Sequence, residues 1–151
     1  MRIFDKHFHI IDFNFLIIKN EGYYPPNFVV EDYQIDAIEL PEIASTIEKL
    51  PAISIDHLWL SEEGLPHLLK IVDKGGDVKA IGFGRVELDV ENVLKSIYEV
   101  NPDALMFGTD FPSTRAKRPF EYGDIKLIQQ LFDEQATDNI LYTNAFKWYF
   151  G

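Results

Sequence analysis

The chain has 151 residues, of which 46% are hydrophobic and 14% aromatic, so it can bury one substantial core, and we expect a single domain over residues 1–151. The formal net charge of -11 opposes binding to nucleic-acid phosphates or anionic membranes through bulk electrostatics. The chain contains no cysteine, which excludes disulfides, thiolate metal sites and a cysteine nucleophile.

The N-terminus has no basic region followed by an apolar core, and no apolar run approaches the length of a membrane span. We therefore expect a cytoplasmic protein. Its partners should be small molecules rather than nucleic acid or membranes, and nitrogen and oxygen atoms must supply any metal ligands.

The hydrophobic pattern predicts alternating strands and helices. In chain order, we expect strands over residues 2–10, 52–56, 78–84 and 104–110, and helices over 30–40, 41–50, 65–76, 90–100, 124–134 and 144–150. The segment 22–28, "GYYPPNF", reads as a turn-rich loop, because proline disfavours helix in the residue before it. Asp89 is a candidate N-cap for the helix over 90–100. The alternation of strands and helices indicates a parallel sheet.

The first strand contains two histidines one residue apart, His7 and His9, in "FDKHFHIID". Residues i and i+2 of a strand project to the same face, so both imidazoles could point at one metal ion. The spacing alone is equally compatible with ordinary surface or core histidines.

Chemically active side chains lie at the carboxyl end of each predicted strand. The first strand ends at His7 and His9, the second at Asp56 and His57, the third near Arg85 and the fourth at Asp110. Ligands of parallel α/β folds bind at this edge, where these side chains would converge. Imidazoles and a carboxylate suit zinc, manganese or iron, and a metal-bound water would favour hydrolysis. Taken singly, an aspartate after Gly-Thr is also a common turn or cap residue.

The sequence resembles the amidohydrolase-related family of metal-dependent hydrolases. The matching segments are "DKHFHIID", "IDHLWLSEEGLP", "VKAIGFGRVE", "LMFGTDFPSTRAKRPF" and "NILYTNAFKW". The resemblance implies a (β/α)₈ barrel with the HxH pair on the first strand, a histidine on the sixth and an aspartate on the eighth. It also implies that His7 and His9 are metal ligands, that His57 is a ligand or orients the substrate, and that Asp110 is both ligand and proton acceptor.

The chain is too short to close such a barrel, which typically needs about 250 residues. The resemblance passes from the first strand to the helix before the sixth, so strands two to five have no counterpart, nor does the family's mid-barrel ligand. The remaining strands are neighbours in a closed barrel. We therefore expect a half-barrel of TIM type, with parallel strands in the order 52–56, 78–84, 104–110, 2–10 and helices on one side.

A half-barrel has two open strand edges and an uncovered inner face, and such surfaces promote association. A twofold dimer would cover them. We therefore expect a homodimer with a large apolar interface.

Three functions fit these observations. The first is a hydrolase of an ester, lactone or amide, with zinc or manganese held by His7, His9 and Asp110, with or without His57 as a fourth ligand. In that case Arg85, Arg115 and Arg118 could bind a substrate carboxylate, although the run 115–118 could equally be a solvated loop. The second is a non-catalytic relative that acts as a binding protein, and the third is a deletion product that folds without a specific role.

Overall fold

The computed structural model describes residues 1–5, 52–59, 64–111, 113 and 116–151. The predicted helices over 30–40 and 41–50 and the loop 22–28 lie outside these residues. Among the described residues, no helix combines the length and apolar character needed to cross a bilayer. In chain order, the elements are β1 Ser54–Ile55, the 3₁₀ turn η2 His57–Trp59, α2 Leu65–Asp73, β2 Asp77–Ala80, α3 Val90–Val100, β3 Leu105–Phe107, α4 Tyr122–Leu131, α5 Glu134–Asp138, the π-helix η3 Asn139–Thr143 and α6 Asn144–Phe150.

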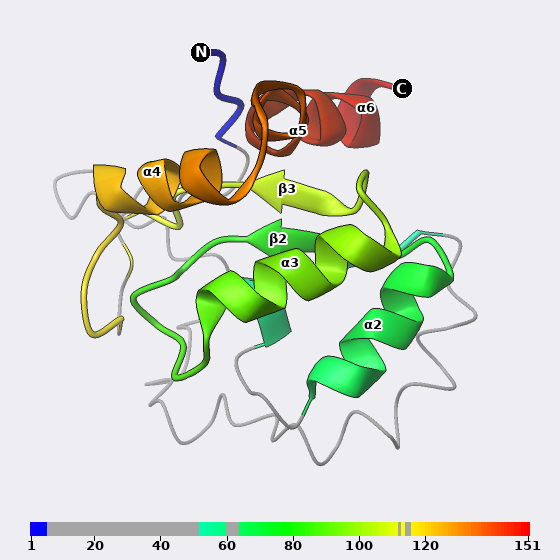
Figure 1. The fold of residues 1–151 in the computed structure, drawn as a ribbon, viewed down its shortest axis with the longest axis horizontal. Coiled ribbons are helices and arrows are strands. Elements are labelled where there is room, and N and C mark those ends of the chain that lie inside the picture. Colours follow the sequence, from blue (N-terminus) through cyan, green and yellow to red (C-terminus); the bar gives the residue numbers. More distant parts are fainter. Residues whose placement is uncertain (6–51, 60–63, 112, 114–115) are drawn as a thin grey trace, which may run out of the picture.

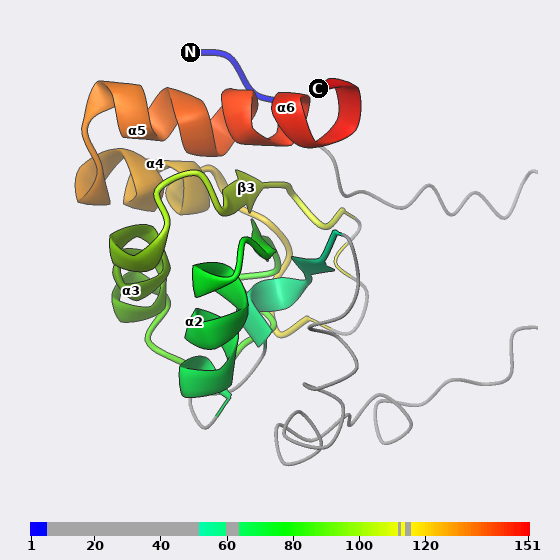
Figure 2. The ribbon, with the colours of Figure 1, turned by 90° about the vertical axis from the view of Figure 1, so that its right-hand side faces the viewer.

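The three described strands form a parallel sheet in the order β1-β2-β3, as the sequence predicts for them. Helices α2 and α3 lie against one face of this sheet (Figures 1 and 2). The helical segment that runs from α5 through η3 to α6 lies on the far side of β3 from β2 (Figure 1). An open parallel sheet with helices on one side confirms the predicted partial barrel.

Strand β2 separates the core from the opposite face of the sheet. Val78 and Ala80 are fully buried, whereas Asp77 and Lys79 alternate with them and are half-buried. Because successive strand residues point to opposite faces, Lys79 lies on the face away from the core. Its ammonium group contacts the Asp56 carboxylate at 2.6 Å. The inner face of the half-barrel is therefore polar at this position.

Helix α3 begins where the sequence predicts. The Asp89 side chain accepts a hydrogen bond from the Asn92 amide at 3.1 Å and so caps the first turn. The apolar face of α3 is buried in the core. The core consists chiefly of Leu68, Ile71, Val72, Val78, Ala80, Val93, Leu94, Ile97, Leu105, Phe107, Ile125, Ile128, Ile140 and Leu141.

The N-terminal segment lies beside η3 and α6 (Figure 2). The Phe4 amide donates to the Leu141 carbonyl at 2.8 Å, and the Phe4 ring packs edge-on against Tyr142 and Phe150. Residues 1–5 are not part of a strand, and the rest of the predicted strand over 2–10 lies outside the described residues. The pairing of a fourth strand with β3 therefore stays a prediction.

The predicted helix over 124–134 is instead two helices. Phe132 takes an extended conformation between α4 and α5, where its ring packs against Tyr98 at 4.8 Å between centroids. Asp133 then caps α5 by accepting from the Ala136 amide at 2.8 Å. The break at Phe132 places α5, η3 and α6 along β3, where the buried Asn144 amide group donates to the Leu105 carbonyl at 3.0 Å.

Candidate functional site

Left-handed backbone conformations follow each of the three described strands. His57 follows β1 with φ 54°, Gly82 follows β2 with φ 64° and Asp110 follows β3 with φ 57°. Positive φ is uncommon for residues other than glycine and is often retained at functional sites. These turns end the strands and hold the side chains of His57 and Asp110 at the carboxyl edge of the sheet.

Gly82 lies close to both the His57 imidazole and the Asp110 carboxylate. A Cβ atom built on Gly82 would lie 2.7 Å from His57 Nδ1 and 3.3 Å from Asp110 Oδ2. Only a residue without a side chain leaves this space open. The imidazole and the carboxylate, predicted from separate strands, therefore face the same small region.

Asp110 is buried and forms an ion pair with Arg85. Its side chain is 2% exposed, while that of Arg85 is 21% exposed. Arg85 donates to Asp110 Oδ2 from Nη2 at 2.7 Å and from Nε at 3.2 Å. Because guanidinium and carboxylate carry opposite charges, the pair compensates much of the cost of burying Asp110.

The N-terminal segment reaches the same edge of the sheet through Asp5. The Asp5 carboxylate accepts hydrogen bonds from the Thr109 amide at 3.0 Å and from the Thr109 hydroxyl at 2.5 Å. These bonds place Asp5 beside the residue that precedes Asp110. His7 and His9 follow in the sequence but lie outside the described residues.

The loops after β2 and β3 are joined by several contacts. The Lys117 amide donates to the Gly84 carbonyl at 2.9 Å, and the Lys117 ammonium pairs with Glu87. A Cβ atom on Gly84 would lie 2.2 Å from the Arg118 carbonyl oxygen. The two loops therefore pack backbone against backbone, which fixes the position from which Arg85 extends.

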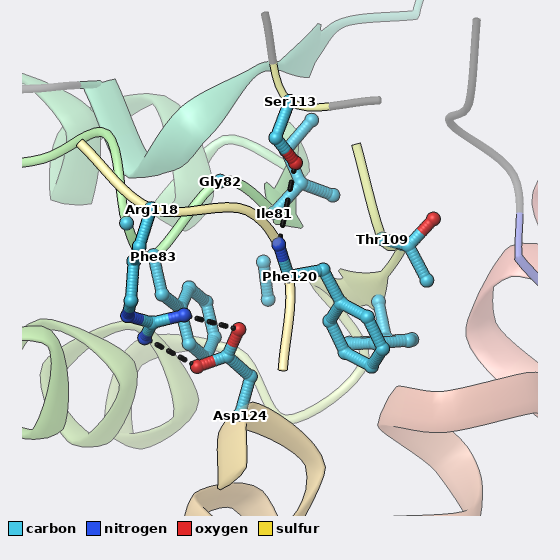
Figure 3. A pocket seen from close by; sticks show the side chains of 12 residues that line it. Ile81, Gly82, Phe83, Thr109, Ser113, Arg118, Phe120 and Asp124 are labelled. Atoms are coloured by element: carbon cyan, nitrogen blue, oxygen red, sulfur yellow. Dashed lines mark hydrogen bonds and ion pairs between the residues drawn. The ribbon is translucent and has the colours of Figure 1, made fainter. Parts of the chain in front are cut away.

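Arg118 lies in this loop but points to the N-terminus of α4 (Figure 3). Its guanidinium donates to both oxygens of Asp124, at 2.6 and 3.1 Å, and these bonds raise the pKa of Arg118 above its ordinary value. Asp124 also accepts from the Glu121 amide and completes a capping box. Arg118 thus has a structural role at the start of α4.

A shallow depression lies between the loops after β2 and β3 (Figure 3). It is too narrow to hold a water molecule. Its lining comprises Ala80, Ile81, Gly82, Phe83, Gly84, Phe107, Gly108, Thr109, Ser113, Arg118, Phe120 and Asp124. The depression as described is therefore a packed junction between loops rather than a substrate pocket.

Of the predicted site residues, the structure brings His57, Arg85 and Asp110 together, and it directs Arg118 to Asp124. Arg115 lies outside the described residues, as do both predicted histidine ligands. Among the residues that the structure describes, no group of three or more His, Cys, Asp or Glu side chains could hold a metal ion.

Sequence reasoning missed Asp5 and Gly82. Asp5 stands two residues before the first histidine of the HxH pair in the predicted strand over 2–10, and that spacing could have suggested a role at the same edge. Gly82 is the first glycine of "GFG", inside the predicted strand over 78–84, and a glycine within a strand pattern often marks a bend or a close approach to the backbone.

Comparisons with known proteins bear on the family and the fold of this chain. A family model described as "Amidohydrolase" matches residues 5–151. A solved structure, "Amidohydrolase 2 from Bifidobacterium longum subsp. infantis", superposes with a TM-score of 0.56 at 20% sequence identity and shares the fold. The match covers 72% of this chain and 44% of that chain, as expected of a partial barrel. No curated protein matches the sequence.

Proposed function

Because this chain belongs to the amidohydrolase family, we propose that it is a metal-dependent hydrolase acting on an ester, lactone or amide bond of a small carboxylated substrate. The observation that carries the proposal is the convergence of His57 and Asp110 on the space beside Gly82, with Arg85 on the same carboxylate. This convergence lies at the carboxyl edge of a parallel sheet, where such folds carry their active sites.

The described residues at this edge of the sheet offer the types of donor atom that a divalent metal ion binds. One imidazole nitrogen and one carboxylate oxygen approach the space that a Cβ on Gly82 would fill. Zinc and manganese accept such ligands. We propose His7, His9 and Asp110 as the ligands, with His57 either as a fourth ligand or as the group that orients the substrate. Asp5 is bound to Thr109, and the two residues from Asp5 to His7 span at most about 7 Å.

When bound, the cation would lower the pKa of a water molecule and polarise the substrate carbonyl. Asp110 would accept a proton at its carboxylate, from a position fixed by Arg85. His57, on the neighbouring strand end, would orient the substrate or move a proton at Nδ1. Burial of Asp110 among the loop residues restricts competing water.

Arg85 is the strongest candidate for binding a substrate carboxylate. A guanidinium has five N–H donors, and Arg85 directs two of them to Asp110. Arg118 directs three of its donors to Asp124 and the Pro119 carbonyl, so it has fewer to offer. Arg115 remains a further candidate, since it lies outside the described residues.

We also expect the chain to act as a homodimer in the cytoplasm. Within the described residues, β1 and β3 each pair with β2 alone, so neither has a second strand partner there. A second copy could cover them. Sedimentation velocity should show twice the chain mass, and a compact monomer at high micromolar concentration would contradict this expectation.

The proposed reaction can be tested with carboxylated esters, lactones and amides and their uncharged analogues. We expect zinc- or manganese-supplemented protein to hydrolyse at least one carboxylated compound faster than its uncharged analogue. Asp110→Asn, which keeps the side-chain shape but not the charge, should remove this activity. Turnover no greater than that of Asp110→Asn across the whole set would contradict the proposal.

A further inference from the structure

Asp110 presents its carboxylate to Arg85 from a left-handed backbone conformation, with φ 57°. Such a conformation in a residue other than glycine persists where surrounding contacts fix it. We infer that Asp5 is a positioning residue that acts through Thr109 to hold Asp110 in this conformation. The effect of Asp5 on the geometry of Asp110 is independent of the reaction, whereas its effect on turnover rests on the proposed function.

The Thr109 hydroxyl links Asp5 to the backbone around Asp110. It donates to Asp5 Oδ2 at 2.5 Å and accepts from the Phe111 amide at 3.3 Å. A hydroxyl has one proton to donate and two lone pairs with which to accept. Because Asp5 takes the proton, the lone pairs are left for the Phe111 amide. The Asp5 carboxylate therefore fixes the direction from which the hydroxyl holds the peptide that follows Asp110.

The other oxygen of Asp5 holds the backbone on the preceding side. Asp5 Oδ1 accepts from the Thr109 amide at 3.0 Å. A carboxylate that accepts two hydrogen bonds from one residue restricts the orientation of that residue as well as its position. The Asp110 carbonyl also accepts from the Ser113 amide at 2.6 Å. The backbone is thus tied on both sides of Asp110, and Asp5 makes the bond from outside the loop.

Asp5 can support Thr109 because contacts elsewhere hold the N-terminal segment in place (Figure 2). The Phe4 amide donates to the Leu141 carbonyl of η3 at 2.8 Å. Arg2 forms an ion pair with Asp138 at the end of α5. These contacts lie on the helical segment beside β3, so they place Asp5 without help from the loop that it supports.

Asp5 could instead serve only to anchor the N-terminal segment, and Asp138 offers the comparison that separates the two roles. The Asp138 carboxylate also ties this segment to the rest of the chain, through Arg2, at the end of α5 rather than in the loop after β3. If anchoring is the whole role of Asp5, loss of either carboxylate should disturb Asp110 equally. If Asp5 positions Asp110, loss of Asp5 should disturb it far more.

The test is hydrogen exchange of the Arg85 Nε–H group, measured by NMR on the full chain. Nε donates to Asp110 Oδ2 at 3.2 Å, so protection of this proton reports whether the carboxylate is in place. Asp5→Ala should speed the exchange by about tenfold or more, as expected when hydrogen bonds to a charged group are lost. Asp138→Ala should change it by no more than about twofold, because distant substitutions act independently.

Two variants of Thr109 cover the case in which Asp5→Ala fails to fold. Thr109→Val keeps the shape of the side chain and the amide bond to Asp5 but has no hydroxyl, so exchange at Arg85 should again be about tenfold faster. Thr109→Ser keeps the hydroxyl and should retain the protection seen in the wild type. Retention by serine separates the role of the hydroxyl from that of side-chain packing.

Hydrolysis by the same variants links the geometry to the reaction. If Asp110 accepts the proton, Asp5→Ala and Thr109→Val should lower kcat more than they raise KM.

Unchanged protection of Arg85 in both Asp5→Ala and Thr109→Val would overturn the inference, and so would equal losses of protection in Asp5→Ala and Asp138→Ala. Absence of hydrolysis by the wild type would overturn the proposed function alone, since the exchange measurement still decides the role of Asp5.

Discussion

Replacing Asp110 with alanine is expected to destabilise the fold by about 2–4 kcal/mol and to abolish both metal binding and hydrolysis. Breaking a buried ion pair costs about 3–5 kcal/mol, and the partial exposure of Arg85 reduces that cost. Alanine also tolerates the left-handed conformation at φ 57° less well than aspartate, which adds about 1 kcal/mol. Urea denaturation of the variant and the wild type measures the change.

Asp110→Asn is the matched control for this prediction. Asparagine adopts the left-handed conformation readily and can still accept a hydrogen bond from Arg85. We therefore expect Asp110→Asn to be more stable than Asp110→Ala but equally unable to bind metal. If the alanine variant unfolds at the same urea concentration as wild type, the Arg85–Asp110 pair contributes nothing to the fold.

Replacing Gly84 with alanine is expected to lower the free energy of unfolding by about 1–3 kcal/mol or more and to weaken zinc binding. The added Cβ would lie 2.2 Å from the Arg118 carbonyl oxygen, which belongs to the backbone and cannot rotate away. The loops after β2 and β3 must then separate, and the bond from the Lys117 amide to Gly84 is lost. Thermal denaturation, together with zinc affinity, measures both effects.

Gly123→Ala provides the comparison within the same chain. A Cβ on Gly123 meets no described atom within 4 Å, and the residue lies in the first turn of α4. Alanine has a higher helix propensity than glycine, so this variant should be unchanged or more stable by up to about 1 kcal/mol. Equal destabilisation of both variants would contradict the close approach of the two loops.

The parts of the fold that depend on local chemistry could be predicted from the sequence. The cap at Asp89 and the apolar face of α3 follow from side chains within one or two helical turns. The order of β1, β2 and β3 follows from the alternation of strands and helices and from the family resemblance. The cap and the apolar face are encoded over a short stretch of chain, whereas the strand order depends on the repeated pattern of strands and helices.

Features that depend on tertiary contacts could not be predicted in this way. The predicted helix over 124–134 is interrupted because Phe132 packs against Tyr98 of another helix. The π-helix η3 is followed by Asn144, whose side chain donates a hydrogen bond to a carbonyl of β3. No helical pattern in the sequence predicts this bond. Strand β2 ends at Ala80, before Gly82 turns left-handed, although the apolar pattern continues to residue 84.

The candidate site shows the same division. Strand ends in a parallel sheet predict that His57 and Asp110 lie at one edge, and the structure places both beside Gly82. The bond from Arg85 to Asp110 joins residues 25 apart, and its geometry depends on how two loops pack. The sequence identified Arg85 as a residue that could bind a substrate carboxylate, but it did not predict the ion pair of Arg85 with Asp110.

A zinc or manganese titration of the wild-type chain and His9→Ala tests the central claim most directly. We expect the wild type to bind one ion per chain, with an affinity that weakens as pH falls because protons compete for the imidazole nitrogens. His9→Ala should lose this binding while it unfolds at the same temperature in the absence of metal. Equal and negligible binding by the wild type and His9→Ala would contradict a metal site built from His7, His9 and Asp110.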